Sequence, residues 1–543
     1  MHRSIPAFLL AALLGLGQSA NAQTFPTDDP VLRRLWSLGM DSSQTEALSQ
    51  VLLDSIGPRL TGTDGQKRGN DWLVRTYTSW GIEARNEQSG TWRAWRRGHS
   101  HIDLIAPRAR SLEGTMLGFS PGTKKKNLDA TTIILPRFAD STEFVAWLPM
   151  AKGKLVLVSA PQPTCRPTAD WTEHGTLESR ERMDSLKAQV RREWAGPNVR
   201  GTGYSLALGT GELGLRLEAA GVAGILTSRP KDAWGTIEIF DTYNKKAPAV
   251  ALSCEDYGLV FRLTERNQGP RLRLNLDAEL LPDRPIFNTI ATIPGEKADE
   301  YVLLSAHFDS WDGSSGATDN GTGSITMLEA MRLLKAAYPK PKRTILVGHW
   351  TSEENGLVGS RAFSEDHPEV RNGLQTLINQ DNGTGRIVRM SGAGLPDLAR
   401  HQSEWLTRIP MEFRMYIDFT GNGFPSGGGS DDASFICYGV PSFSIGGQSW
   451  NYGNYTWHTN RDTYDKIVFD DLESNATLTA MLAYLASEDT SRISLERVDL
   501  VAAAAEAEAR AAQNPNPAAR RFPIPTKWPE CEAAPRTTKP RLK

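Results

Sequence analysis

Residues 301–323, YVLLSAHFDSWDGSSGATDNGTG, constrain the fold of this 543-residue chain more than any other stretch. The apolar run Val302–Leu304 is short and leads into a glycine-rich loop, which is typical of a buried strand that ends at a site. The loop carries His307, Asp309 and Asp319. We therefore expect the chemistry of the chain at the carboxyl end of this strand.

The second half of the chain alternates between strand-like and helix-like segments. We expect strands over 289–293, 301–306, 344–350, 376–380 and 442–445, a helix over 323–337, and further helix over 470–510. Alternation at these lengths predicts an α/β fold with a central sheet flanked by helices. Open α/β sheets place their sites at the carboxyl ends of the strands, where the polar motifs of this half fall.

The first half of the chain has a different pattern. Apolar spacing predicts helices over 41–55 and 65–80, joined by the turn sequence IGPRLTGTDG. From about residue 102 to residue 280, short apolar runs indicate a separate strand-rich module. We expect strands with turns over 102–134, strands over 154–159, 249–260 and 271–276, and a helix end that turns into a strand over 219–226. The densely charged segment 173–192 predicts an exposed helix. Beyond residue 514 the composition indicates a Pro-rich tail with little to bury.

The N-terminus matches a secretory signal. Basic residues precede the apolar run 8–16, and Ala20-Asn21-Ala22 follows it, so we expect cleavage after Ala22 and an exported protein, periplasmic or extracellular. The apolar run is too short for a membrane anchor, and no later stretch is long enough to span a bilayer. The formal net charge of -2 gives no reason to expect nucleic acid or an anionic membrane as a partner.

Four cysteines are too few and too scattered for a disulfide framework or a cysteine metal site. One disulfide bridge remains possible. Cys165 and Cys254 fall in the same expected module and form the better pair, and free buried thiols are the alternative.

Five side chains form the expected metal site: His307, Asp319, Glu354, Asp381 and His458. Two imidazoles with several carboxylates suit zinc or a similar divalent ion. Two such ions lie close together only when an anionic group bridges them, and we expect Asp319 to be that bridge. His307 and Asp381 would then complete the ligands of one metal, and Glu354 and His458 would complete those of the other.

Two further carboxylates are expected to be catalytic. Asp309 follows His307 by two residues and is placed to hold the second imidazole nitrogen. Glu353 precedes a ligand, and because adjacent residues project differently, its carboxylate is free to act as general base toward a water activated by the metals. We do not expect His349 to be a ligand, because it lies inside an apolar strand and is better explained as a core histidine.

The order of these motifs resembles the co-catalytic zinc exopeptidases of the leucyl-aminopeptidase and glutamate-carboxypeptidase group. The likeness rests on His307-x-Asp309, Asp319-Asn320-Gly321, Glu353-Glu354-Asn355-Gly356, Asp381, Ser430-Asp431 and His458-Thr459-x-x-Asp462-Thr463. It implies a mixed central sheet, interrupted by a protease-associated domain that forms a lid, and the same ligand and catalytic roles as above. We expect a peptidase domain over 23–114 and 281–513, with the lid at 115–280 and the tail at 514–543.

One position departs from the group. Many of its aminopeptidases carry histidine after the Ser-Asp pair, whereas this chain has Asp432, so substrate preference does not transfer. Asp431 and Asp432 are candidates for binding a free amino terminus, and Arg461 for binding a carboxylate, with loop packing as the equal alternative. Tyr452 and Tyr455 are candidates for polarising the oxyanion.

The expected function is an exported metallo-exopeptidase that uses two zinc ions to hydrolyse dipeptides or short peptides. A one-zinc glutaminyl cyclase is the first alternative, and retention of both His307 and Asp381 argues against it. A metal-free binding or scaffold protein of the same fold is the second, and here every ligand and the base are present. The sequence does not decide whether the protein forms a homodimer. It also does not decide whether residues are removed from the amino or the carboxyl end of the substrate.

Overall fold

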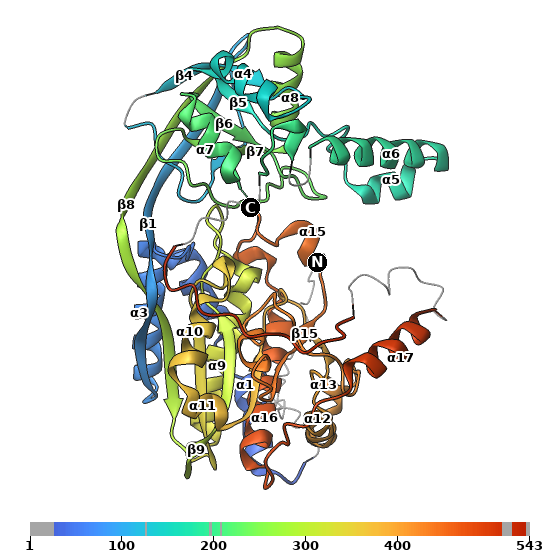
Figure 1. Ribbon diagram of the computed structural model, residues 1–543. Coiled ribbons are helices and arrows are strands. Elements are labelled where there is room, and N and C mark those ends of the chain that lie inside the picture. Colours follow the sequence, from blue (N-terminus) through green and yellow to red (C-terminus); the bar gives the residue numbers. More distant parts are fainter. Residues whose placement is uncertain (1–26, 125–126, 195–197, 207–208, 513–523, 539–543) are drawn as a thin grey trace, which may run out of the picture.

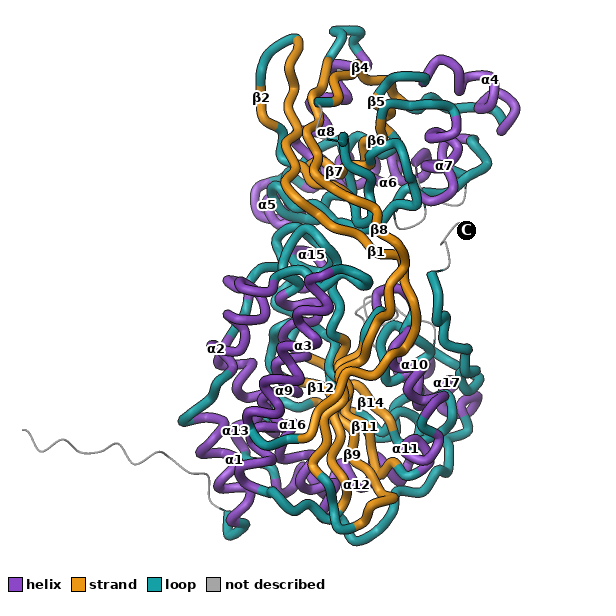
Figure 2. The backbone as a smooth tube through the Cα atoms, turned by 90° about the vertical axis from the view of Figure 1, so that its left-hand side faces the viewer, coloured by secondary structure: helices purple, strands orange, loops and turns teal. Residues whose placement is uncertain are grey.

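The computed structural model describes residues 27–124, 127–194, 198–206, 209–512 and 524–538, so the expected signal over residues 1–22 lies outside the described part. The chain forms two lobes (Figure 1). Two long antiparallel strands, β1 (Glu83–Ala106) and β8 (Arg271–Ile293), run through both lobes and join them (Figure 2). We expected the lid domain to end at residue 280, but β8 runs past this residue without a break. The strand therefore marks no boundary there, and the expected domain limits remain a prediction.

The larger lobe is built on a mixed sheet with the strand order β14-β11-β9-β10-β8. Strands β14, β11, β9 and β10 are parallel to one another, and β10 is antiparallel to β8. The mixed sheet confirms the predicted fold class. Its remaining strands have the bounds β9 (Lys297–His307), β10 (Arg343–Trp350), β11 (Leu374–Asn379) and β14 (Ser442–Ser444).

Helices cover both faces of this sheet (Figure 2). Every residue of β10 and of β11 is buried, as expected for parallel strands between two helical layers. The helices of this lobe are α1 (Pro30–Met40), α2 (Thr45–Gln50), η1 (Val51–Ile56), α3 (Asp64–Ser79), η3 (Ala317–Gly321), α9 (Thr322–Ala337), η4 (Glu353–Asn355), α10 (Val358–Asp366), α11 (Pro368–Asn372), α12 (Pro396–Arg408), α13 (Met411–Arg414), α14 (Ala433–Ile436), α15 (Tyr452–Tyr455), η5 (Tyr464–Lys466), α16 (Phe469–Glu488) and α17 (Leu500–Ala512). A small separate sheet has the order β13 (Asp418–Phe419), β12 (Ile387–Met390) and β15 (Gly446–Gly447).

The smaller lobe, here called the lid, continues the same sheet in the order β8-β4-β5-β6-β7-β3. Its strands are β2 (Arg110–Ser111), β3 (Gly114–Met116), β4 (Leu128–Ile134), β5 (Leu155–Leu157), β6 (Gly224–Thr227) and β7 (Ala249–Leu252). Its helices are α4 (Ser141–Ala151), α5 (Thr168–His174), α6 (Leu177–Trp194), η2 (Val199–Gly201), α7 (Gly211–Ala219) and α8 (Cys254–Glu265). The lid is therefore a mixed α/β module rather than mainly strand.

Two local predictions were wrong. The expected strand over 249–260 ends at Leu252, because the Ser253 hydroxyl accepts from the backbone N–H of Asp256 and caps α8. The expected helix over 470–510 is interrupted between Glu488 and Leu500. There the Arg343 guanidinium binds carbonyl oxygens that a continuous helix would use internally.

Two disulfides tie the chain together. The first joins Cys165 to Cys254 within the lid, which is the pair that the sequence favoured for a bridge, with free thiols as the alternative. The second joins Cys437 to Cys531, which the sequence did not predict. The second bridge anchors part of the expected tail: Trp528 donates to the carbonyl of Ile436 at 2.9 Å, and the described residues 524–538 return to the body of the protein. Among the described residues, none of the helices combines the length and apolar composition that crossing a bilayer requires.

Candidate metal centre

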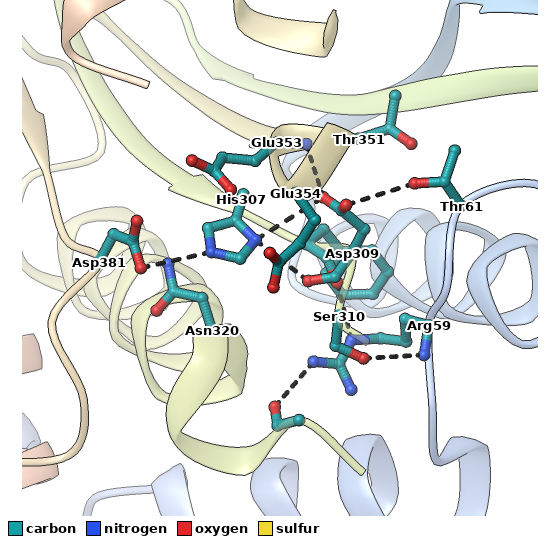
Figure 3. Close-up of polar contacts among 12 residues, drawn as sticks. Arg59, Thr61, His307, Asp309, Ser310, Asn320, Thr351, Glu353, Glu354 and Asp381 are labelled. Carbon is teal, nitrogen blue, oxygen red and sulfur yellow. Dashed lines mark hydrogen bonds and ion pairs between the residues drawn. The ribbon is translucent and has the colours of Figure 1, made fainter. Parts of the chain in front are cut away.

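The expected ligands lie where neighbouring parallel strands end. His307 is the last residue of β9, Glu353 and Glu354 follow β10, and Asp381 follows β11. Strands β11, β9 and β10 are adjacent in the sheet, so their carboxyl ends share one edge. The fold therefore brings together side chains that are up to 74 residues apart within this set (Figure 3).

Two groups of three side chains are each compact enough to hold an ion. One is His307, Asp319 and Asp381, and the other is Asp319, Glu354 and His458. In the first, His307 Nε2 lies 3.4 Å from Asp319 Oδ1 and 3.3 Å from Asp381 Oδ1. In the second, His458 Nε2 lies 3.1 Å from Asp319 Oδ2 and 3.0 Å from Glu354 Oε2.

Asp319 belongs to both groups, and its two oxygens face different histidines. Its Oδ1 is the oxygen close to His307, and its Oδ2 is the oxygen close to His458. A carboxylate that offers one oxygen to each side is the geometry that a bridging ligand needs. The five expected ligands therefore meet in one place, as two groups of three that share Asp319.

The electrostatics of this cluster fit divalent cations. Burial raises the pKa of Glu353 well above its usual value and also raises that of Glu354. Burial alone would lower the pKa of His307 and His458, but the neighbouring carboxylates outweigh it and raise both, that of His458 to about 10. The cluster thus gathers buried carboxylates around two imidazoles, an arrangement that favours bound positive charge.

Arg59 supports the loop between His307 and Asp319 through hydrogen bonds. It is fully buried, and its guanidinium donates to the carbonyl oxygens of Phe308, Ser315 and Gly316 at 2.7–2.9 Å (Figure 3). Backbone carbonyls in a buried loop need donors, and one guanidinium provides several in a fixed arrangement. Arg59, in the segment DSIGPRLTG, thus supports the loop that carries the expected ligands, although the two segments are about 250 positions apart in the sequence.

Asp462 orients the bridging residue. Its carboxylate accepts from the Thr318 backbone N–H at 2.8 Å, from the Thr318 hydroxyl at 2.8 Å and from the Asp319 backbone N–H at 3.0 Å. Burial raises the pKa of Asp462 to about 7. Sequence reasoning included Asp462 in the motif but assigned it no role, and the signal that would have found it is its fixed spacing after His458.

Aromatic rings hold His458. The Trp457 ring stacks on its imidazole with centroids 3.8 Å apart, and Phe240 of the lid meets it edge-on at 5.2 Å. The lid also bonds to the backbone here, because the Ile239 N–H donates to the His458 carbonyl at 2.8 Å and Asn460 pairs with Ile237. The lid is therefore docked directly on the loop that carries one ligand.

Asp309 lies behind His307 as expected, but through a different atom. The His307 Nδ1 lies 3.0 Å from the Asp309 backbone carbonyl and 3.6 Å from its carboxylate. The Asp309 carboxylate instead accepts from the Glu353 backbone N–H at 3.0 Å and from the Thr61 hydroxyl at 3.3 Å (Figure 3). Asp309 thus connects the first metal position to the residue expected to be the base.

A cavity of about 380 Å³ opens above the ligands. The ligands Asp319, Glu354, Asp381 and His458 line it, together with Glu353, Gly356, Leu357, Arg361, Gly428, Gly429, Tyr452 and Trp457. Glu353 is outside both groups of ligands and reaches the same cavity, which is the position a general base requires. The cavity is in the size range of small-ligand sites.

The other candidate residues divide between the cavity and the surrounding structure. Tyr452 lines the cavity, whereas Tyr455 lines only a neighbouring hollow of about 490 Å³ between the lid and the larger lobe. Asp432 is buried and accepts from the Ser444 hydroxyl at 2.9 Å, and Arg461 pairs with Glu113 of the lid, so both follow the packing interpretation. Asp431 is fully buried and is not among the residues that line the cavity.

His349 is the core histidine that the sequence predicted. It is fully buried within β10, and its Nε2 lies 2.8 Å from the Tyr77 hydroxyl. Burial lowers its pKa to about 3, so the ring is neutral under ordinary conditions.

Comparison with known proteins agrees with this site. Residues 288–483, which carry all five expected ligands, match the sequence profile of peptidase family M28. Carboxypeptidase Q of Bos taurus is 24% identical over 439 residues, which is 81% of this chain and 84% of that protein. Leucine aminopeptidase 1 of Pyrenophora tritici-repentis is 29% identical over 215 residues, 36% of this chain and 54% of that protein.

Solved structures share the fold. A peptidase M28 precursor from Shewanella amazonensis has a TM-score of 0.62 at 24% identity, covering 86% of this chain and 97% of that chain. A zinc aminopeptidase from Bacillus subtilis has a TM-score of 0.50 at 18% identity, covering 84% and 97%. The profile match and the curated relatives confirm the resemblance stated from the motifs, and the solved structures confirm the fold.

Proposed function

We propose that this chain, a metallo-exopeptidase related to peptidase family M28, hydrolyses dipeptides or short peptides at a two-zinc centre formed by His307, Asp319, Glu354, Asp381 and His458. The enzyme class follows from the family match and from the curated relatives, which are carboxypeptidases and aminopeptidases by name. The single observation that carries the two-metal proposal is the Asp319 carboxylate, which presents one oxygen to each ligand group.

The side chains present suit zinc. Imidazole nitrogens and carboxylate oxygens are its usual protein ligands besides thiolate, and each group here has three, which leaves a position open for water or substrate. When bound, a pair of zinc ions lowers the pKa of a water and favours negative charge at the scissile carbonyl. His307 and Asp381 would hold one ion, Glu354 and His458 the other, and Asp319 both.

Glu353 would move the proton. Its carboxylate lines the cavity, and its backbone is fixed by the bond to Asp309. It lies outside both ligand groups, so in this proposal its carboxylate stays free of the metals and available to a water. It would take the proton of the attacking water and deliver it to the departing amine, and Asp309 would keep both His307 and Glu353 in position.

The tyrosine at the cavity wall has a supporting role in this proposal. Burial and the nearby carboxylates, Asp319 foremost, raise the pKa of Tyr452 well above its usual value, so its hydroxyl keeps its proton. A neutral hydroxyl at this wall can donate to the substrate carbonyl as it gains negative charge. Tyr452 is therefore the better candidate of the two tyrosines.

Export is the proposed localisation. The sequence begins with a pattern typical of a secretory signal, and both disulfides of the structure form most readily outside the cytoplasm. We propose a periplasmic or extracellular enzyme.

A dipeptide panel tests the proposed function. The purified chain, loaded with zinc, is incubated with free dipeptides and with the same dipeptides blocked at either terminus, before and after chelation. We expect cleavage that chelation abolishes and that added zinc restores. Cyclisation of N-terminal glutamine without dipeptide cleavage would support the cyclase alternative, and binding without turnover would support a scaffold protein.

A further inference from the structure

Arg361 brings a permanent positive charge to the wall of the cavity. It lies on α10, which begins four residues after Glu354, and its side chain is only 18% exposed. Of the residues that line this cavity in the described part of the chain, Arg361 is the one Lys or Arg, among the carboxylates of Asp319, Glu353, Glu354 and Asp381. A guanidinium stays protonated at any ordinary pH and pairs with carboxylates through two parallel hydrogen bonds.

The partner of Arg361 comes from the C-terminal segment. Its Nη1 lies 2.9 Å from Oε2 of Glu532, whose side chain is 72% exposed. The Glu532 side of this pair is in contact with solvent, which weakens the pair, so another carboxylate can replace Glu532 at small cost. The Cys437–Cys531 bridge fixes the residue next to Glu532, and this tether keeps the glutamate near Arg361.

Open space surrounds this pair on the side of the cavity. Gly356, Gly428 and Gly429 line the cavity, and a Cβ added at any of the three would meet no atom within 4 Å. Gly428 also lines a small hollow shared with Arg361 and Glu532. The glycines therefore leave room for a ligand between the metal ligands and Arg361.

We propose that Arg361 binds the free α-carboxylate of a short peptide and that Glu532 occupies this position until substrate displaces it. This inference rests on the proposed function and names its substrate class: peptides with an unblocked carboxyl terminus. The scissile bond would lie over the ligand cluster, and the terminal carboxylate would lie at Arg361, the only Lys or Arg of the described cavity wall. The carboxylate of the substrate and that of Glu532 would compete for one guanidinium.

The test compares a free dipeptide with its C-terminal amide in the zinc-loaded full-length enzyme. For wild type we expect the free acid to be cleaved with the higher kcat/KM. Arg361→Ala should raise KM for the free acid by about 10- to 100-fold, the usual worth of a charge-assisted hydrogen bond, with little change for the amide. Arg361→Lys should recover part of the loss, because it restores the charge without the planar fork.

Glu532→Gln should act in the opposite direction. It removes the competing charge while keeping the shape, so we expect KM for the free acid to fall and KM for the amide to stay the same. Arg536→Ala is the matched control, because Arg536 anchors the same segment to Glu365 and Asp366 of α10 without lining the cavity. It should leave the ratio of acid to amide cleavage unchanged.

The outcomes separate the two proposals. An acid-to-amide ratio that Arg361→Ala leaves at the wild-type value overturns the carboxylate site while the proposed peptidase stands. A wild type that prefers the amide does the same. Failure of the zinc-loaded wild type to cleave either substrate overturns the proposed function and the carboxylate site with it.

Discussion

The buried carboxylate of Asp462 accepts a hydrogen bond of 3.0 Å from the backbone N–H of Asp319, the residue shared by the two ligand groups. It accepts two more from Thr318, the residue before. A carboxylate held this way fixes the backbone on which the bridging side chain stands. Asp462 therefore positions Asp319 although it faces neither ligand group itself.

Asp462→Asn tests this relationship. The amide nitrogen of asparagine cannot accept from Thr318 or Asp319, so the bridging carboxylate loses part of its support. We expect zinc affinity to fall by about 10- to 100-fold, the usual effect of losing a partner that orients a ligand, with activity returning at high zinc. Competition with a chelator measures the affinity. Asp465→Asn, at an exposed position three residues later, is the control, and equal affinity in both variants would refute the role of Asp462.

Glu353→Gln separates the base from the ligands. Glutamine keeps the size of the side chain but cannot take a proton, so turnover should fall by about 10² to 10⁴ while the zinc content stays at the wild-type value. Glu354→Gln, one residue on, should instead lose zinc, because Glu354 belongs to a ligand group. Elemental analysis with steady-state kinetics checks both. Undiminished turnover in Glu353→Gln would remove it from the mechanism.

The buried imidazole of His349 predicts a stability change with pH. Its pKa is about 3 in the folded chain and about 6.5 when unfolded, so below pH 6.5 the unfolded state binds a proton that the folded state does not. Stability from this residue is complete above pH 6.5 and falls as pH decreases toward 3, by up to about 1.4 kcal/mol per pH unit. Urea unfolding at pH 7.5 and 5.5 should show a smaller loss in His349→Gln than in wild type. Equal losses would show that His349 is not the titrating group.

The bridge between Cys437 and Cys531 should stabilise the fold. It closes a loop of 94 residues, and cross-links over such lengths typically contribute about 2–5 kcal/mol. We expect the double variant Cys437→Ser, Cys531→Ser to have a lower free energy of unfolding and a more protease-sensitive C-terminal segment. Peptide mapping without reductant should recover two pairs of disulfide-linked peptides, one pair joined through Cys437 and Cys531 and the other through Cys165 and Cys254. Alkylation of Cys531 in the unreduced protein would contradict the bridge.

The sequence predicted the part of the fold that local pattern controls. The strand ending at His307, the Glu353-Glu354 pair after the next strand and the short strand β11 before Asp381 each carry their own signal in a few residues. Once these strands are taken as parallel neighbours, their carboxyl ends share an edge and the ligands must meet. Strand order alone therefore brings His307, Glu354 and Asp381 together. Asp319 in η3 and His458 in the loop after α15 follow no strand of this sheet directly, and the ordered motifs rather than strand ends predicted that they join the same cluster.

What the sequence did not predict depends on pairings with no local signal. The contacts of Arg59 with carbonyls near residue 315 follow from the packing of η1 and α3 beside the metal loop. The docking of Ile239 on His458 joins segments 219 positions apart. The polar, Pro-rich stretch after residue 514 was expected to be a tail because it has few apolar residues to bury. It is instead held by the Cys437–Cys531 bond and a few contacts, and neither depends on an apolar core.

The position of zinc in crystals of the loaded protein tests the central claim most directly. Anomalous diffraction at the zinc absorption edge should show two peaks about 3.5–4 Å apart, the spacing of two-metal hydrolytic sites, with one oxygen of Asp319 beside each. His307 and Asp381 should flank one peak, and Glu354 and His458 the other. A single peak, or peaks away from Asp319, would contradict the two-metal centre described here.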